Sequence, residues 1–119
     1  MKLLGIDYGT KRIGVAVSDE DGKLAFPREI LPNDRQIFEK LEELISNEKI
    51  AEVVIGEAEI ISEKGQEFAK VLEKKLQVKV HTIREELTTL EARRYQSSQA
   101  DARAAALILQ RYLDRKNLI

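Results

Sequence analysis

The 119-residue chain has no cysteine and no tryptophan, a single histidine (His81), only two prolines and few aromatic residues. Without cysteine, a disulfide scaffold and thiolate chemistry are both excluded. One histidine is too few for a histidine-rich zinc site. No apolar run approaches the ~18 residues of a membrane-spanning helix, and the N-terminus does not resemble a secretory signal. We therefore expect a cytoplasmic protein with no membrane partner.

The chain also lacks an excess of either charge. It has 20 Lys and Arg residues against 21 Asp and Glu residues, which gives a formal net charge of -1. Taken by itself, this balance argues against a nucleic-acid partner, because such proteins commonly present a basic surface. The length and the 43% hydrophobic content predict one globular domain over residues 1–119.

The hydrophobic pattern predicts an α/β protein. Apolar runs predict strands over residues 3–6 and 13–17, and a third strand starts at Lys23 after the turn signal Asp21-Gly22. Helical spacing follows over residues 37–45, with Asn33 or Asp34 as the expected N-cap. The remaining sequence predicts strands over residues 52–56 and 78–83. It predicts helices over residues 62–76, from residue 88 onward, and over residues 102–113. The helix from Thr88 is predicted by a capping box.

The resulting order is βββαβαβαα. Strands that alternate with helices imply parallel crossovers, whereas the first three strands form an antiparallel meander. We therefore predict a mixed five-stranded sheet flanked by helices.

Four acidic residues stand where such a sheet would bring strand ends together. Asp7 ends the first strand, Glu57 follows the fourth, Glu85 follows the fifth, and Asp101 opens the last helix. Each has an ordinary structural interpretation as well: Asp7 as a turn residue, Asp101 as an acid favoured by the helix dipole, and the two glutamates as solvated loop residues. Open α/β sheets, however, place their sites at the carboxyl ends of strands.

These acids together predict a metal site. Ligand sets made only of oxygen suit Mg²⁺ or Mn²⁺ better than zinc. Two such ions ~4 Å apart can activate a water and stabilise the leaving oxygen in phosphodiester hydrolysis. Gly9 follows Asp7 in the turn Tyr8-Gly9-Thr10-Lys11, where a glycine lets backbone amides approach an anion.

The segment from Asp7 to Asp19, Asp-Tyr-Gly-Thr-Lys-Arg-Ile-Gly-Val-Ala-Val-Ser-Asp, closely resembles the signature of the YqgF (RuvX-like) family. Two further segments, 87–92 and 101–113, resemble the other two blocks of that family. This resemblance implies an RNase H-like fold related to the RuvC resolvases. It also implies a metal-dependent nuclease that either matures the 16S ribosomal RNA precursor or resolves Holliday junctions.

The resemblance also implies residue roles. Asp7, Glu85 and Asp101 match the metal-binding acids, with Glu57 as the alternative second acid, because RuvC-like enzymes keep an acid on that strand. Lys11 and Arg12 match basic residues beside the site that hold phosphate. The residues expected to bind substrate are Gly9, Thr10, Lys11, Arg12, Thr88, Arg93 and Arg94.

The sequence departs from the family pattern in three places. After the fourth strand, Gly56-Glu57-Ala58 stands where the family has Gly-Leu-Pro. Arg84-Glu85-Glu86 stands where the family has Asp-Glu-Arg, and the basic segment before the last helix is reduced to Arg93-Arg94. These departures keep open a third possibility, a nucleic-acid-binding module without catalysis. The sequence does not distinguish precursor RNA from branched DNA, or a monomer from the homodimer that junction resolution would need.

A metal site would weaken the argument from net charge against a nucleic-acid partner. Residues 84–119 carry 7 basic and 5 acidic side chains, and two divalent ions would add four positive charges where a phosphate must sit. The near-neutral composition therefore predicts weak binding of nucleic acid without metal, and it remains compatible with a nuclease.

Overall fold

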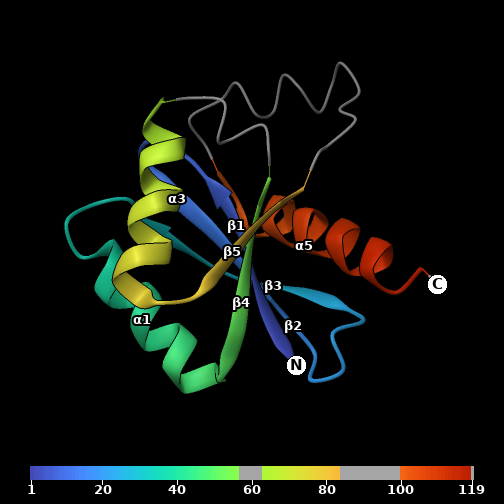
Figure 1. Ribbon diagram of the computed structural model, residues 1–119. Coiled ribbons are helices and arrows are strands. Elements are labelled where there is room, and N and C mark those ends of the chain that lie inside the picture. Colours follow the sequence, from blue (N-terminus) through green and yellow to red (C-terminus); the bar gives the residue numbers. More distant parts are fainter. Residues whose placement is uncertain (57–62, 84–99, 119) are drawn as a thin grey trace, which may run out of the picture.

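The computed structural model describes residues 1–56, 63–83 and 100–118. It contains one five-stranded sheet with the strand order β3-β2-β1-β4-β5 (Figure 1). The elements are β1 (Lys2–Tyr8), β2 (Arg12–Ser18), β3 (Ala25–Pro32), α1 (Ile37–Glu48), β4 (Ile50–Gly56), α3 (Glu63–Leu76), β5 (Lys79–Ile83) and α5 (Ala102–Lys116).

The pairing confirms the predicted α/β architecture. Strand β1 is antiparallel to β2, and β2 is antiparallel to β3, whereas β4 is parallel to both β1 and β5. The mixed sheet is thus an antiparallel meander extended by two parallel crossovers. The predicted helix that begins at Thr88 lies outside the described residues.

The third strand differs from the prediction, because β3 begins at Ala25 rather than Lys23 and runs through both prolines. Proline cannot donate to a strand ladder and is tolerated on an edge strand or at a bulge. Both conditions hold here. β3 is an edge strand, and Pro27 pairs with Ala16 of β2, where the register between the two strands shifts.

The expected cap of the first helix was also wrong. Helix α1 begins at Ile37, and Gln36 occupies the N-cap without a side-chain hydrogen bond. Asp34 instead accepts a hydrogen bond from the backbone N–H of Gln36 at 2.9 Å, in a turn that precedes the helix. Asp and Asn favour such turns as strongly as they favour caps, so the pattern does not separate the two.

The sheet has a separate apolar core on each face. Helices α1 and α3 cover one face, and α5 covers the other (Figure 1). On the first face the buried side chains of the sheet include Leu4, Ile6, Ile13, Val15, Val53 and Ile55. On the second face they include Leu3, Ala16, Val54 and Ile83, which pack with Ala105, Ile108, Leu109 and Leu113 of α5. Helix α5 is therefore fixed against the centre of the sheet.

Candidate active site

Asp7 lies near the end of the central strand β1, on the face covered by α5. Its side chain is only 4% exposed, although it is charged, and burying a carboxylate is costly unless polar groups solvate it. One such group is the backbone N–H of Asp101, which donates to Oδ2 of Asp7 at 3.0 Å. This bond joins residues 94 positions apart and brings two of the predicted metal ligands together.

Asp101 is the N-cap of α5. Its backbone is extended (φ -141°, ψ 164°), and its Oδ1 accepts a hydrogen bond from the N–H of Ala104 at 2.7 Å. Such a cap stabilises a helix by about 1 kcal/mol. The ordinary interpretation of Asp101, as an acid at the start of a helix, is thus correct. The cap fixes its carboxylate at the start of α5, where the backbone N–H of the same residue contacts Asp7.

Two glycines allow α5 to approach the sheet this closely. Gly14 pairs with Asp7 across β1 and β2, and a Cβ built on Gly14 would lie 2.1 Å from the carbonyl oxygen of Asp101. A Cβ on Gly5 would lie 2.7 Å from the carbonyl oxygen of Ala105, one turn further along α5. Only a residue without a side chain fits at Gly14, because the backbone of Asp101 occupies the space.

The turn between β1 and β2 carries the predicted phosphate-binding residues. Gly9 is buried, Thr10 and Lys11 are exposed, and Arg12 is half-buried at the start of β2. Among the described residues, Nε of Arg12 is a buried donor without a hydrogen-bond partner. Buried donors are nearly always paired, so an unpaired one on this turn fits an anion such as a phosphate.

The sequence reasoning missed the role of Asn33. Its side-chain Nδ2 donates to the carbonyl oxygen of Gly9 at 2.8 Å, and its backbone N–H donates to the carbonyl oxygen of Lys11 at 2.9 Å. Asn33 therefore holds the β1–β2 turn from the end of β3, and it does not cap α1 as expected. The pairing of Arg12 with Pro32 places Asn33 beside the turn, and no local signal in the sequence reveals that contact.

The other predicted site residues, Glu57, Glu85, Thr88, Arg93 and Arg94, lie outside the described residues. The strands that precede the two glutamates are described. β4 ends at Gly56 and β5 at Ile83, and these two residues pair with each other at the edge of the sheet where β1 also ends (Figure 1).

The described carboxylates fit a hard divalent cation in their chemistry. Asp7 and Asp101 offer only oxygen donors, as Mg²⁺ and Mn²⁺ prefer. Within residues 1–56, 63–83 and 100–118, no group of three or more His, Asp or Glu side chains is arranged to hold a metal ion. The two described acids could therefore supply part of a metal site, and a complete site would need at least one more ligand.

The single histidine takes no part in this pair. Nε2 of His81 lies 2.7 Å from Oε1 of Glu52, and its ring lies 5.0 Å from that of Tyr112. Burial, together with the charge of Glu52, raises the pKa of the Tyr112 hydroxyl. Tyr112 belongs to the last turns of α5, whereas Asp101 caps its first turn.

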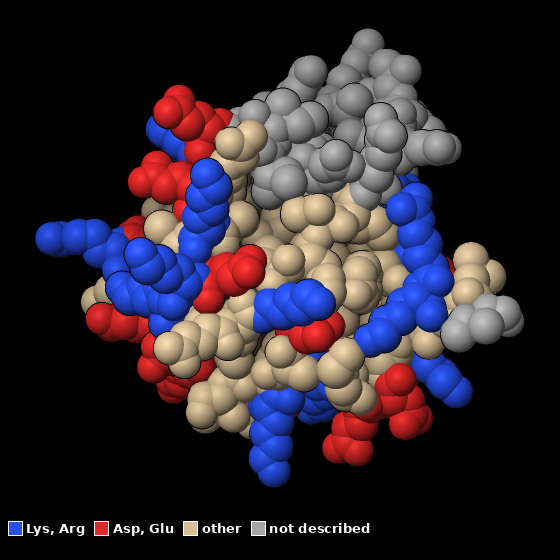
Figure 2. Space-filling view, in the orientation of Figure 1, with Lys and Arg blue, Asp and Glu red and all other residues tan. Residues whose placement is uncertain are grey.

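The visible charges do not form a basic surface. On the face drawn in Figure 2, Lys and Arg side chains are interspersed with Asp and Glu side chains. No helix in the described part of the chain is long and apolar enough to cross a membrane. The mixed surface agrees with the balanced composition.

Solved structures with a similar fold include nucleases that bind branched DNA. "T. thermophilus RuvC in complex with Holliday junction substrate" matches with a TM-score of 0.60 at 16% identity, over 98% of this chain and 95% of that one. The fowlpox virus resolvase, solved with substrate Holliday junction DNA, matches with a TM-score of 0.66 at 11% identity, over 98% and 99%. These likenesses show the RNase H-like fold that the resemblance implied.

Proteins related in sequence are more similar to this chain than the solved structures are. A protein of Maridesulfovibrio salexigens named "Putative pre-16S rRNA nuclease" is 33% identical over 97% of this chain and 99% of its own length. A protein of the same name from a Sulfurihydrogenibium species is 36% identical over 96% of this chain and 90% of its own length. A family model described as "RuvX: Holliday junction resolvase" matches residues 1–115. This match extends from the first strand into the last helix, and the chain therefore belongs to the RuvX family of nucleases.

Proposed function

We propose that this protein is a metal-dependent endonuclease that hydrolyses phosphodiester bonds in structured nucleic acid, with residues 1–119 acting as one domain. The observation that carries the proposal is the hydrogen bond from the N–H of Asp101 to the buried carboxylate of Asp7. Two acids from opposite ends of the chain meet there, at the edge where the parallel strands end. A buried carboxylate at the end of an apolar strand is costly, and titratable groups in such positions cluster at functional sites.

The proposed roles follow from chemistry and position. Asp7 and Asp101 would hold Mg²⁺ or Mn²⁺, most simply two ions, with Glu85 as the third acid and Glu57 as its alternative. A divalent ion bound there supplies a Lewis acid for the scissile phosphate and lowers the pKa of an attacking water. Gly9 and Thr10 would offer backbone amides to a phosphate, and Lys11 and Arg12 would neutralise its charge. Thr88, Arg93 and Arg94 are proposed to extend this contact.

The substrate we favour is the precursor of 16S ribosomal RNA, cut near its 5′ end in the cytoplasm. The names of the relatives that match over nearly the whole chain support this choice. Holliday junction resolution is the second candidate, supported by the family description and by the substrates in the two similar structures. It requires two cuts and hence a homodimer, whereas RNA processing needs only a monomer.

The test compares cleavage of a precursor 16S RNA fragment and a four-way DNA junction, with Mg²⁺, Mn²⁺ or a chelator. We expect metal-dependent cleavage of one substrate, and Asp7→Asn should abolish it while leaving the unfolding midpoint unchanged. An asparagine oxygen can still accept the hydrogen bond from Asp101, so the variant removes the charge and keeps this bond.

Asp101→Asn is a matched second variant, because asparagine caps helices as well as aspartate does. It should also lose cleavage and keep stability. If either variant cuts like wild type, the proposed mechanism is wrong. Metal-independent binding of either substrate without cleavage would instead indicate the non-catalytic module.

A further inference from the structure

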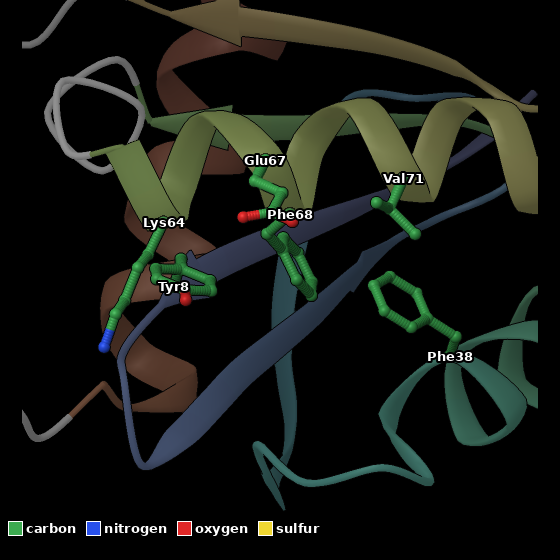
Figure 3. Close-up of a pocket in the computed structure, with 6 residues that line it drawn as sticks. All are labelled: Tyr8, Phe38, Lys64, Glu67, Phe68 and Val71. Atoms are coloured by element: carbon green, nitrogen blue, oxygen red, sulfur yellow. The ribbon is translucent and has the colours of Figure 1, made fainter.

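A hollow of about 220 Å³ opens on the other face of the sheet, near the proposed active site. Figure 3 shows it between β1, α1 and α3. Its lining residues are Tyr8, Phe38, Lys64, Glu67, Phe68 and Val71. Pockets for drug-sized ligands measure about 300–1,000 Å³. This hollow is thus suited to a single ring system and too small for a whole nucleotide cofactor.

The chain connects this hollow directly to the acid pair. Tyr8 follows Asp7, and consecutive strand residues point to opposite faces of a sheet. Asp7 faces α5, whereas Tyr8 packs with the core under α1 and α3. A strand of nucleic acid that places a phosphate beside Asp7 would need to cross only the edge of the sheet to reach the Tyr8 ring.

Aromatic rings form one wall of the hollow. The ring of Tyr8 lies 4.9 Å from that of Phe68, and Phe68 lies 5.3 Å from Phe38 in a stacked arrangement. Phe68 is 6% exposed, so the row is anchored in the core, whereas Tyr8 and Phe38 are half-buried. The planes of Tyr8 and Phe68 are tilted by 46° to each other, so the surface available for stacking is the partly exposed Tyr8 ring itself, held in place by the buried Phe68.

The rim of the hollow carries one cation and one carboxylate. Lys64 and Glu67 are both exposed and project from the first turns of α3 on the side of the Tyr8 ring (Figure 3). A lysine donates hydrogen bonds and attracts phosphate, whereas a carboxylate accepts from the N–H groups of a base edge. An aromatic ring with donor and acceptor groups beside it matches the chemistry of a nucleobase.

We propose that this hollow is a nucleobase subsite, in which an unpaired base next to the scissile phosphate stacks on Tyr8 while Lys64 and Glu67 contact its edge. The proposal rests on the proposed nuclease function. Bases within a duplex are already stacked on both sides, so only an unpaired or extruded base can enter. The preferred substrate is therefore a nucleic acid with an unpaired nucleotide beside the cut, as RNA or as DNA.

Binding of short fluorescent single-stranded RNA and DNA oligonucleotides, measured by anisotropy with Ca²⁺ in place of Mg²⁺, tests the role of Tyr8. Stacking of one base on an aromatic ring corresponds to a change in affinity of about 5- to 150-fold. We expect Tyr8→Leu to weaken binding of single strands in this range, and Tyr8→Phe to preserve it. Blunt duplexes should bind equally to both variants.

Comparing two lysines of α3 distinguishes a specific contact in the hollow from general electrostatic attraction of nucleic acid. Lys64 lines the hollow, whereas Lys70 is exposed on α3 and does not line it. Lys64→Ala should weaken binding of single strands more than Lys70→Ala does, although both remove one positive charge. Equal effects of the two substitutions would refute a specific contact with Lys64.

Photocrosslinking of the wild-type protein gives a readout that does not depend on the folding of a variant. An oligonucleotide with one 5-iodouracil in a single-stranded position forms adducts with aromatic rings that stack on it. We expect the adduct on Tyr8, in the tryptic peptide of residues 3–11. An adduct confined to Tyr112, in the peptide of residues 112–115, would overturn the proposal.

The two hypotheses fail in different ways. If the wild-type protein cuts a substrate in the presence of metal, but Tyr8→Leu binds single strands as tightly as wild type, the subsite is refuted and the nuclease remains. If the wild-type protein neither binds nor cuts any of these nucleic acids, both proposals are wrong.

Discussion

Replacing Gly14 by alanine should separate the two acids without removing either. Gly14 lies opposite Asp7 in the sheet, and its ideal Cβ would meet the carbonyl oxygen of Asp101 at 2.1 Å and the carbonyl carbon at 2.3 Å. Both atoms are backbone, so no side-chain rotation can relieve the contact. Helix α5 must move away from β2 at its N-terminal end.

The size of that movement follows from the same distances. The Cβ–O separation has to open from 2.1 Å to at least 3.0 Å, so the backbone of Asp101 shifts by about 0.9 Å. The hydrogen bond to Asp7 is 3.0 Å long and would be stretched or broken. Overpacking of this kind costs about 1–3 kcal/mol of folding free energy. A misplacement of ~1 Å at an active site can reduce the rate about 100-fold.

Gly5→Ala is the matched control. Its Cβ would contact Ala105 and Leu109 at 2.7 Å, which requires a much smaller shift, and the contact lies one turn away from Asp101. Urea unfolding followed by circular dichroism should show both variants destabilised. Metal-dependent cleavage should fall about 100-fold in Gly14→Ala, whereas Gly5→Ala should retain most of the wild-type rate.

The reasoning is refuted if Gly14→Ala unfolds and cuts like wild type, because α5 would then not be in contact with β2 at this point. Equal losses of cleavage in both glycine variants would also contradict it. In that case the loss would follow general destabilisation and not the separation of the acids.

Two further predictions concern groups around the site and far from it. Asn33→Ala removes the side-chain hydrogen bond to Gly9, worth about 1 kcal/mol. It should raise KM for the nucleic acid more than it lowers kcat, because it loosens the turn that we propose to hold phosphate. Steady-state kinetics check this, and an unchanged KM would contradict it. Hydrogen bonding by Lys2 and the charge of Arg28 hold the pKa of the Glu48 carboxyl below its ordinary value of 4.5. The stability from these two ion pairs is therefore fully present above pH ~4.5 and is lost as pH falls through the lowered pKa of the folded state. Glu48→Gln should flatten that part of the acid unfolding curve, and an identical curve would argue against it.

The sequence by itself determined the type and order of the described elements. Apolar runs of β-branched residues gave β2 and β4, and helical spacing gave α1 and α3. Asp21-Gly22 marked the hairpin between β2 and β3, where Gly22 has a φ of 67°. These signals are local, because they reflect the propensity of a few neighbouring residues and the alternation of burial. The candidate acids Asp7 and Asp101 were also visible in the sequence, through their position beside apolar segments and through the family resemblance.

Only the tertiary structure decided which residues meet. The contact of Asp101 with Asp7 depends on α5 crossing β1 and β2 over Gly5 and Gly14, and nothing near either acid in the sequence encodes that packing. The same holds for Asn33, whose partners belong to a different turn, and for the Tyr8 hollow, whose walls come from three elements. Local propensities fix the elements, but close packing between distant elements selects the few contacts that make a site.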